Sequence, residues 1–352
     1  MLLKHLKLTN FRNYTELDLT FSETPTIFIG PNGAGKSNIL EAVYLLATTK
    51  SPRVENEFEL IKEESGVALV TAVAESENNQ TELQVTMADG AEETTRFSKR
   101  VKVNGVPRKV VDFIGNLPAV IFWPSDINMV TGSPSLRRWH LDLSLAQIFP
   151  NYKKSLTLYE QVLYSRNRVL KRIKEGFGKM DELDYWTDEL IKYGEIVTKH
   201  RVEFFDFINK FESALGNFRF EFKCSEVSKD RLTETNGREV AACNTLIGPH
   251  RDDFKLYLEK RDMAKFGSRG EQRMATLAFK LATLEYMAKI LGKRPILLLD
   301  DVFSELDANH RAQVAEIAKL QQTIIATVEL ENIPQEFLDS SRILKVEDGK
   351  II

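Results

Sequence analysis

The sequence has few cysteines and no long apolar run. Only Cys224 and Cys243 occur among the 352 residues, without CxxC spacing, which argues against a disulfide framework and suits a reducing cytosol. No run of about 18 apolar residues occurs, so no membrane span is predicted. The first residues, MLLKHLKLTNF, are too short and too polar for a signal peptide. We therefore expect a cytoplasmic protein without a membrane partner.

Charge of one sign is not in excess either. The formal net charge of −3 neither supports nor excludes DNA binding, because a local basic face matters more than the sum. The hydrophobic share of 43% and the charged share of 28% are typical of a folded protein. At this length a single core stops growing, so two or more lobes are expected.

The hydrophobic pattern predicts an α/β protein with a helical region in its middle. The opening part contains alternating segments, a buried strand and a helix at Leu2–Leu8, Thr15–Phe21, Thr26–Ile29 and Asn38–Thr48. A β subdomain follows at about 60–112, with strands at Val67–Ala74, Thr81–Met87 and Thr94–Val103. Two helical stretches come next, from Leu156 to Ile173, with a break near Arg166, and from Leu183 to Leu215. They are separated by Gly176–Gly178, which predicts an antiparallel pair. The rest is expected to hold strands and helices at Phe218–Lys223, Asp253–Leu258, Ser268–Leu291, Pro295–Leu299, Asn309–Lys319, Thr323–Val328 and Ile343–Val346.

A phosphate-binding loop stands between the first buried strand and the first helix. The run Gly30-Pro31-Asn32-Gly33-Ala34-Gly35-Lys36-Ser37 matches G-x-x-x-x-G-K-[ST] at every fixed position. Such a loop surrounds a β-phosphate with backbone N–H groups, Lys36 reaches the β/γ oxygens, and the Ser37 hydroxyl binds Mg²⁺. We expect this run and the following Asn38 to bind ATP. A glycine-rich turn without chemistry is the alternative, but the flanking strand and helix argue against it.

Two carboxylates end a second apolar strand, Ile296-Leu297-Leu298-Leu299-Asp300-Asp301. A continuous apolar run is typical of a parallel strand buried on both faces, and ligands bind at the carboxyl ends of such strands. Asp300 is expected to hold Mg²⁺ and Asp301 to position or deprotonate the attacking water. Alternatively, the two aspartates merely end the strand.

Ser268-Arg269-Gly270-Glu271-Gln272 opens a long helix and resembles the signature of ABC-type ATPases. A capping box would explain Ser268 and Glu271, but not Gly270, which costs up to ~1 kcal/mol in a helix relative to Ala. In ABC heads the signature Ser contacts the γ-phosphate held by the opposite protomer. The resemblance therefore implies that Ser268 and Gly270 contact nucleotide across a dimer.

Two further segments near Asp301 have an ABC-like position. Ser304-Glu305-Leu306-Asp307 resembles a D-loop, although it is equally consistent with an ordinary helix start. Thr327 ends a buried strand where ABC proteins often place a switch His. A His-assisted hydrolysis is therefore not expected, and the Asp at 301, where many ABC ATPases have Glu, predicts slow turnover.

The two ATP motifs are far apart in the chain. Lys36 and Asp300 lie 264 residues apart (300 − 36), so an insertion must leave and re-enter the ATPase core. This split is typical of the SMC/RecF/RecN branch, while transporter ATPases have a shorter insert and a Q-loop that is not evident near Ala119–Asp126. Each helix of the insert has about 30 residues and spans only ~45 Å, without sustained heptads. A short helical lobe at 125–243 is therefore expected between the head segments 1–124 and 244–352.

Several stretches together resemble the RecF family over nearly the whole chain. They are Asn10-Phe11-Arg12-Asn13-Tyr14, Gly30–Ser37, Gly132-Ser133-Pro134 with Arg137-Arg138, Gly248-Pro249-His250-Arg251-Asp252-Asp253, Ser268–Arg273 and Leu298–Asp307. The resemblance implies an ABC-type P-loop NTPase head with a β subdomain and an inserted helical lobe. It also implies that Arg12 contacts the nucleotide, although Arg12 is equally consistent with an ordinary surface arginine.

The same resemblance implies a function in DNA repair. Two ATP molecules would join a homodimer that clamps double-stranded or gapped DNA at single-strand/double-strand junctions. With RecR and RecO, the dimer would help RecA load, and slow ATP hydrolysis would act as a timer. Rival hypotheses are a transporter ATP-binding subunit, an SMC-like ATPase coupled to a nuclease, and a purely structural α/β protein.

Two groups of polar residues are each consistent with more than one role. His250, Asp252 and Asp253 are expected to form a structural turn whose charges pair locally, with a metal site as the alternative. DNA contacts are sought among the basic residues Arg137, Arg138, Lys153, Lys154, Arg166, Arg168, Lys171, Arg172 and Lys174. Each of these clusters is also explained by a solvated helix face.

Overall fold

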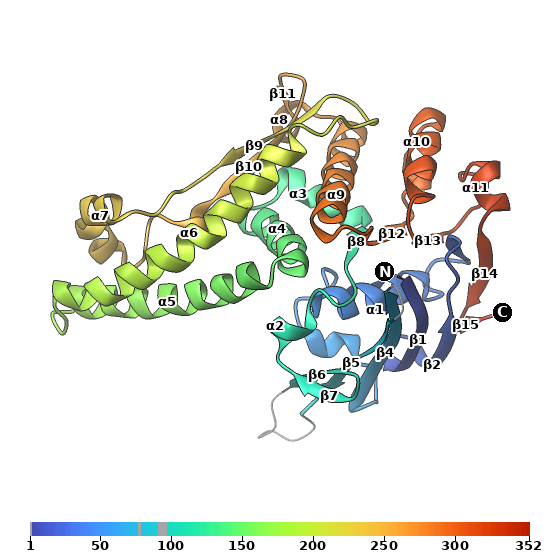
Figure 1. Cartoon of the computed structure of the whole chain (residues 1–352), viewed down its shortest axis with the longest axis horizontal. Helices are drawn as coiled ribbons and strands as arrows, with labels where there is room; N and C mark the ends of the chain where they lie inside the picture. Colours follow the sequence, from blue (N-terminus) through green and yellow to red (C-terminus); the bar gives the residue numbers. More distant parts are fainter. Residues whose placement is uncertain (1, 77–78, 91–96) are drawn as a thin grey trace. The chain divides into compact units, whose positions relative to one another are not determined.

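The computed structural model describes residues 2–76, 79–90 and 97–352 (Figure 1). The chain divides into two compact units. The first unit contains Met1–Ile127, Ser213–Gly216 and Thr276–Ile352, and the second contains Asn128–Glu212 and Asn217–Ala275. The division falls inside one helix, α9 (Arg269–Leu291).

A largely parallel sheet forms the centre of the first unit. Its strand order is β15-β14-β3-β13-β12-β8, and all neighbours are parallel except β15 and β14. The bounds are β3 Thr26–Ile29, β8 Ala119–Phe122, β12 Ile296–Asp300, β13 Thr323–Thr327, β14 Arg342–Glu347 and β15 Lys350–Ile351. Every residue of β8 and β13 is buried, as continuous apolar runs predict. Because β3 and β12 both flank β13 in parallel, the segments that follow them emerge at the same edge of the sheet.

Helices in the first unit precede or follow these strands in sequence. They are α1 Lys36–Thr48, α2 Val110–Phe113, α10 Ala308–Ala318 and α11 Gln335–Asp339, with the larger part of α9. The predicted start of the first helix at Asn38 is two residues late, because α1 begins at Lys36 inside the phosphate-loop motif.

An antiparallel sheet, in the order β2-β1-β4-β5-β6-β7, accounts for the predicted β subdomain. Its strands are β1 Leu2–Phe11, β2 Tyr14–Thr20, β4 Val67–Ser76, β5 Asn79–Ala88, β6 Ser98–Val103 and β7 Val106–Arg108. Buried positions alternate along β4 and β5, as expected when one face of a sheet is packed and the other is solvated. Of the expected strand Thr94–Val103, the first three residues lie outside the described part of the chain.

The second unit is built on the two long helices α5 (Pro150–Lys174) and α6 (Leu183–Ile208), which form the antiparallel pair predicted from the sequence (Figure 1). They have 25 and 26 residues, fewer than the 30 expected, and α5 continues through Arg166 without a break. The remaining elements are α3 Asn128–Thr131, α4 Pro134–Ile148, α7 Lys229–Ala242, α8 Met263–Phe266, and the strands β9 Phe218–Lys223, β10 Asp253–Leu258 and β11 Arg261–Asp262. Neither α4 nor α7 was predicted.

The second unit extends past residue 243, where the helical lobe was expected to end. Strand β10 pairs with β9 along its whole length, from Asp253 opposite Lys223 to Leu258 opposite Phe218. This pairing ties residues 253–258 to the helical region rather than to the head. Among the residues described, no helix combines the length and apolarity needed to cross a membrane.

Candidate nucleotide-binding site

The loop between β3 and α1 has its shape fixed by close contacts inside the first unit. A Cβ atom at Gly30 would lie 2.1 Å from the backbone oxygen of Val346 in β14. Gly35 has φ 115°, and a Cβ there would lie within 2.9 Å of side-chain atoms of Asn13 and Tyr14. Both glycines are therefore required by packing as well as by any ligand.

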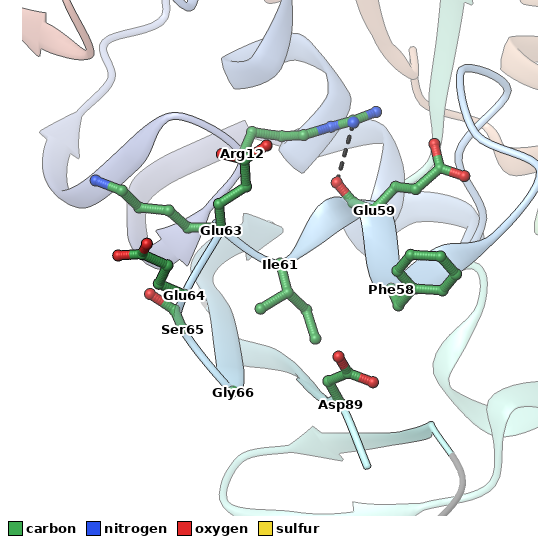
Figure 2. Close-up of a pocket in the computed structure, with 10 residues that line it drawn as sticks. Arg12, Phe58, Glu59, Ile61, Glu63, Glu64, Ser65, Gly66 and Asp89 are labelled. Atoms are coloured by element: carbon green, nitrogen blue, oxygen red, sulfur yellow. Dashed lines mark hydrogen bonds between the residues drawn. The ribbon is translucent and has the colours of Figure 1, made fainter. Parts of the chain in front are cut away.

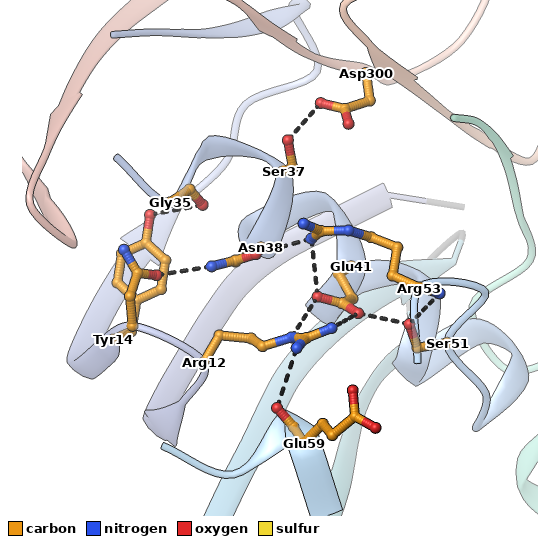
Figure 3. Close-up of polar contacts among 11 residues, drawn as sticks. Arg12, Tyr14, Gly35, Ser37, Asn38, Glu41, Ser51, Arg53, Glu59 and Asp300 are labelled. Carbon is orange, nitrogen blue, oxygen red and sulfur yellow. Dashed lines mark hydrogen bonds and ion pairs between the residues drawn. The ribbon is translucent and has the colours of Figure 1, made fainter. Parts of the chain in front are cut away.

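Polar groups from the β1–β2 turn, β2 and the β14–β15 turn hold the loop carbonyls. Asn13 Nδ2 donates to the Ala34 oxygen at 3.0 Å, and the Tyr14 hydroxyl donates to the Gly35 oxygen at 3.1 Å. Gly349 N donates to the same Ala34 oxygen at 2.9 Å. Figure 3 shows the contact of Tyr14 with Gly35. In the sequence, Asn13 and Tyr14 were noted only as part of a stretch that resembles a family. Their role in holding the loop was not predicted.

The backbone N–H groups of the loop, unlike its carbonyls, largely lack protein partners among the residues that the structure describes. Within the described residues, no protein acceptor is recorded for the backbone N–H groups of Gly33, Gly35, Lys36 and Ser37. Unpaired N–H groups at a helix N-terminus, together with the helix dipole, favour a bound phosphate. The loop therefore fits the triphosphate expected from the sequence.

Lys36 is folded over its own loop. Its side chain is only 7% exposed, and Nζ donates to the backbone oxygens of Gly30 at 2.7 Å and Pro31 at 2.8 Å. Burial lowers the pKa of Lys36, while the charges of Asp300 and Asp301 act in the opposite direction. A cation satisfied only by neutral carbonyls is suited to exchange them for anionic oxygens.

Ser37 and Asp300 meet although 263 positions separate them in the chain. Ser37 Oγ donates to Asp300 Oδ1 at 2.7 Å (Figure 3). Burial raises the pKa of Asp300 to about 6, partly opposed by the Ser37 hydrogen bond and by the charges of Arg53 and Lys36. A hydroxyl and a carboxylate are hard oxygen ligands, and Mg²⁺ in nucleotide sites uses one or two such groups besides phosphates. Among the described residues, no group of three or more His, Cys, Asp or Glu is suited to a metal ion, so this pair is the arrangement that fits Mg²⁺.

Asp301 follows directly, in a left-handed conformation with φ 50°, which is costly for a residue other than Gly. Its backbone N donates to the Ala326 oxygen at 2.8 Å. Thr327 Oγ1 lies 3.4 Å from Asp301 Oδ1 and 3.0 Å from the Glu329 oxygen. The structure thus brings Asp301 and the expected switch position together at the edge of the sheet, while their catalytic roles stay predictions.

Arg12 has partners within the first unit. Its Nε and Nη2 atoms donate to the two carboxylate oxygens of Glu41 at 2.9 and 2.7 Å, and Glu41 is fully buried. Ser51 and Arg53 donate to the same carboxylate at 2.5 and 3.1 Å (Figure 3). Arg12 therefore neutralises a buried charge under the loop, and its contact with nucleotide stays a prediction.

Arg53 was missed by the sequence analysis. Its guanidinium lies 5.4 Å from the centre of the Trp123 ring, and Nη1 donates to Asn38 Oδ1 at 2.8 Å. Asn38 in turn donates to Asn13 Oδ1 at 2.9 Å. Asn38 is thus tied to the groups that surround the loop. A lone arginine in a polar segment carries no signal from which this position follows.

A cavity of 510 Å³ opens beside Arg12 and does not suit a triphosphate (Figure 2). Its lining includes four carboxylates and two cations, namely Glu59, Glu63, Glu64, Asp89, Arg12 and Lys62. A net negative lining repels phosphate oxygens. We therefore expect the phosphates to bind at the loop between β3 and α1 and not in this cavity.

The signature-like residues lie in the second unit, at the start of α9. Ser268 Oγ accepts from Glu271 N at 3.3 Å, and a Glu271 oxygen accepts from Ser268 N at 2.8 Å. The expected capping box is therefore present. The Ser268 hydrogen bonds and Arg261 lower the pKa of Glu271 to about 2. Ser268 and Gly270 are both exposed, and their contact with nucleotide across a dimer stays a prediction.

The segment from Gly248 to Asp253 forms ion pairs with distant helices, so the expectation of local pairing is wrong. Asp252 Oδ2 accepts from Arg201 in α6 at 2.8 Å, and Asp253 accepts from Arg137 in α4 at 2.6 Å. His250 Nδ1 lies 2.6 Å from the Tyr159 hydroxyl of α5. The segment therefore joins three helices of the second unit, because Asp252, Asp253 and His250 each contact a side chain on a different helix.

Two of the proposed DNA-contacting arginines are buried. Arg166 is fully buried, 2.7 Å from Glu239 Oε2, and Arg137 is 8% exposed and paired with Asp253. Neither side chain is available to a phosphate backbone, because each neutralises a carboxylate inside the second unit. Of the others, Arg138 donates to a backbone oxygen, Lys171 and Arg172 pair with carboxylates, and Lys174 donates to a backbone oxygen.

Known proteins resemble the chain over its whole length. A family model described as "RecF/RecN/SMC N terminal domain" matches residues 2–351. The chain is 35% identical over 377 residues to the "DNA replication and repair protein RecF" of Halalkalibacterium halodurans, covering 100% of this chain and 99% of the relative. A protein of the same name from Bacillus cereus is 32% identical, covering 100% of this chain and 98% of the relative.

Solved structures give the same result. One described as "Structure of the recombination mediator protein RecF-ATP in RecFOR pathway" has a TM-score of 0.86 and 30% identity, covering 99% of this chain and 96% of that chain. A Smc head domain from Pyrococcus furiosus has a TM-score of 0.53 at 17% identity, covering 99% of this chain and 95% of that chain, and shows the fold alone. The ABC-type head expected from the sequence is confirmed. The family model and the full-length identity above 30% show that the chain belongs to the RecF family, in the group that RecF forms with RecN and SMC proteins.

Proposed function

We propose that this chain is an ATP-dependent DNA-binding protein of recombinational repair that dimerises when it binds ATP. The observation that carries the proposal is the 2.7 Å hydrogen bond between Ser37 and Asp300. It joins the two motifs that a P-loop ATPase needs at one phosphate, across an insertion that splits the head as is typical of the SMC/RecF/RecN branch.

Each residue of the site has a distinct role in this proposal. The N–H groups of Gly33, Gly35, Lys36 and Ser37 and the Lys36 ammonium bind the phosphates of ATP. Ser37 and Asp300 hold Mg²⁺. When bound, the metal neutralises phosphate charge. Asp301 orients the attacking water and accepts its proton. Because Asp is one methylene shorter than Glu, hydrolysis is slow and acts as a timer.

The dimer follows from the surface at the start of α9. A Cβ at Gly270 would meet nothing within 4 Å, so packing within the chain does not require a glycine there. A surface glycine next to an exposed serine leaves room for the nucleotide of a second copy to approach the backbone. Ser268 and Gly270 would complete the site that Lys36 and Asp300 begin in the partner.

The DNA substrate and the partner proteins are proposed from the relatives. Those relatives are described as DNA replication and repair proteins and as a recombination mediator of the RecFOR pathway. By this relation the dimer clamps double-stranded or gapped DNA and, with RecR and RecO, helps RecA to load.

Sedimentation velocity tests the proposal with the full chain, with and without ATP and a gapped duplex. We expect a monomer without ATP, a dimer with ATP and Mg²⁺, and co-sedimentation of the dimer with DNA. A chain that stays monomeric with saturating ATP and ignores the duplex would contradict the proposal.

Two variants separate the steps. Ser268→Arg should leave ATP binding by the monomer intact and block the dimer, since it fills the surface where the partner approaches. Asp301→Asn should bind ATP and prolong the dimer because the water is no longer deprotonated. Wild-type turnover by Asp301→Asn would remove the role assigned to that carboxylate.

A further inference from the structure

The β6–β7 hairpin of the first unit concentrates positive charge. Between residues 97 and 111 the sequence has five Lys or Arg residues and no Asp or Glu, in a chain whose formal net charge is −3. The turn at Asn104 and Gly105, both with positive φ, makes a tight hairpin of a kind common between antiparallel strands. Strand β7 is the last in the sheet order, so the charges lie at an edge.

The strand register places two of these cations on the face opposite the core. Arg100 and Lys102 alternate with Val101, which is 3% exposed. Arg100 stands opposite Thr86 and Lys102 opposite Gln84 on β5. Within the described register, no partner of β6 is acidic. The face therefore combines two cations with Gln84 and Thr86, while Glu82, two residues before Gln84, is the acidic residue on that face of β5.

Most of the cations on this hairpin lack a counter-charge. Lys99, on the core side, is paired with Glu57 at 2.6 Å. In contrast, no ion pair or hydrogen bond of the side chains of Arg100, Lys102, Arg108 and Lys109 is recorded among the described residues, and three of the four are exposed. Six of the nine basic residues considered from the sequence have polar partners in the second unit, whereas no ion pair is recorded among the described residues for Lys153, Lys154 and Arg168. The hairpin is therefore a further candidate for an external anion.

We infer that the β6–β7 hairpin contacts the phosphate backbone of duplex DNA, an inference that rests on the proposed function. Backbone contacts are made by Arg and Lys together with Thr and Gln side chains and carry no sequence preference. Arg100 and Lys102 lie on the same face as Gln84 and Thr86. Arg108 stands opposite Val101, so its charge comes from the other face of the hairpin edge. The inference adds a DNA contact made by residues of the first unit, whereas the basic residues considered from the sequence belong to the second unit.

The test replaces the four unpaired cations together, as Arg100→Gln, Lys102→Gln, Arg108→Gln and Lys109→Gln. Binding of the ATP-bound protein to a fluorescent gapped duplex is measured by anisotropy between 50 and 200 mM salt. Each lost phosphate contact lowers the slope of log K against log salt by about 0.9, so the slope should fall by about three units or more. Affinity at 100 mM salt should fall at least tenfold on the same basis, to an order of magnitude.

The control variant carries an equal charge change at lysines that already have carboxylate partners. These are Lys192, Lys229, Lys255 and Lys319, each changed to Gln. The control should keep the wild-type slope, and both variants should keep ATP binding and dimerisation. If the quadruple variant unfolds, the single changes Arg100→Gln and Lys102→Gln replace it, each with an expected loss of about one unit of slope.

Three outcomes would overturn the inference in different ways. If the hairpin variant and the control have equal slopes of log K against log salt, the hairpin does not contact DNA. The proposed function would be unaffected by that result. Loss of ATP-driven dimerisation in the hairpin variant would assign the cations to the subunit contact or to an acidic protein surface. Absence of DNA binding by the wild-type protein would remove the proposed function as well.

Discussion

The two units contain buried cations of two different kinds. In the second unit, the buried Arg166 and Arg201 lie 2.7 and 2.8 Å from the carboxylates of Glu239 and Asp252. In the first unit, the buried Lys36 donates only to two backbone oxygens. The cations of the second unit are thus neutralised internally, as is the buried Lys280 of the first unit by Asp126 at 3.1 Å. Lys36 differs because it remains available to an external anion.

This difference distinguishes buried charges that stabilise the fold from a buried charge that is available to bind a ligand. Removing one partner of a buried ion pair leaves the other charge unpaired in a medium that solvates it poorly. A cation that rests on neutral carbonyls leaves no such charge behind. Substitution of one member of a buried ion pair should therefore reduce stability. Substitution of the cation that rests on carbonyls should reduce ligand binding.

The largest effect is expected from Arg166→Met. Glu239, which is fully buried, loses its counter-charge, and unfolding free energy should fall by about 3–5 kcal/mol. Urea unfolding measures this loss. The double variant Arg166→Met with Glu239→Leu is the control and should recover most of the stability, since it removes both charges. A single variant as stable as the wild type would show that the pair does not hold the helices together.

A smaller loss of stability is expected when the pH is lowered. Burial lowers the pKa of His250 to about 4, below the ordinary value of about 6.5. Between these values the unfolded chain binds a proton that the folded chain does not, so stability should fall as pH decreases from 6.5 to 4. The loss attributable to His250 is about 2–3 kcal/mol.

His250→Gln tests this contribution because glutamine carries no charge at any pH in the range. The difference in unfolding free energy between pH 7 and pH 4 should be smaller in the variant than in the wild type. Parallel pH profiles for the two proteins would mean that His250 is not the group responsible.

The smallest effect on stability is expected from Lys36→Met. Only two carbonyl contacts are lost, which predicts a change of about 1 kcal/mol or less, yet ATP binding should disappear because the phosphates lose their cation. Equilibrium binding of a fluorescent ATP analogue and urea unfolding give the two quantities. A large loss of stability without loss of binding would reverse the comparison between the units.

The elements around the nucleotide loop were predictable because their signals are local. Strand β3 has the predicted bounds Thr26–Ile29. Two strands of the second unit, β9 and β10, also have their predicted bounds. Each is an apolar or alternating run with turn residues nearby. The pairing of Ser37 with Asp300 was predictable as well, since both motifs require the same phosphate.

The second unit was harder to predict because polar residues occupy core positions. Arg166 interrupts the apolar periodicity of α5, yet the helix continues, since Glu239 compensates its charge. In α7 the buried side chains are Leu232, Thr235 and Glu239, which form no apolar stripe. Only the fold shows that such residues have partners, because those partners lie on other helices.

The contact between Gly30 and Val346 also has a consequence for biosynthesis. The two residues are 316 positions apart (346 − 30), which corresponds to about 15–60 s of translation at 5–20 residues per second. During that interval a nascent chain has its phosphate loop without the β14 backbone that packs against it. The growing polypeptide should therefore acquire nucleotide affinity late, after β14 has emerged from the ribosome.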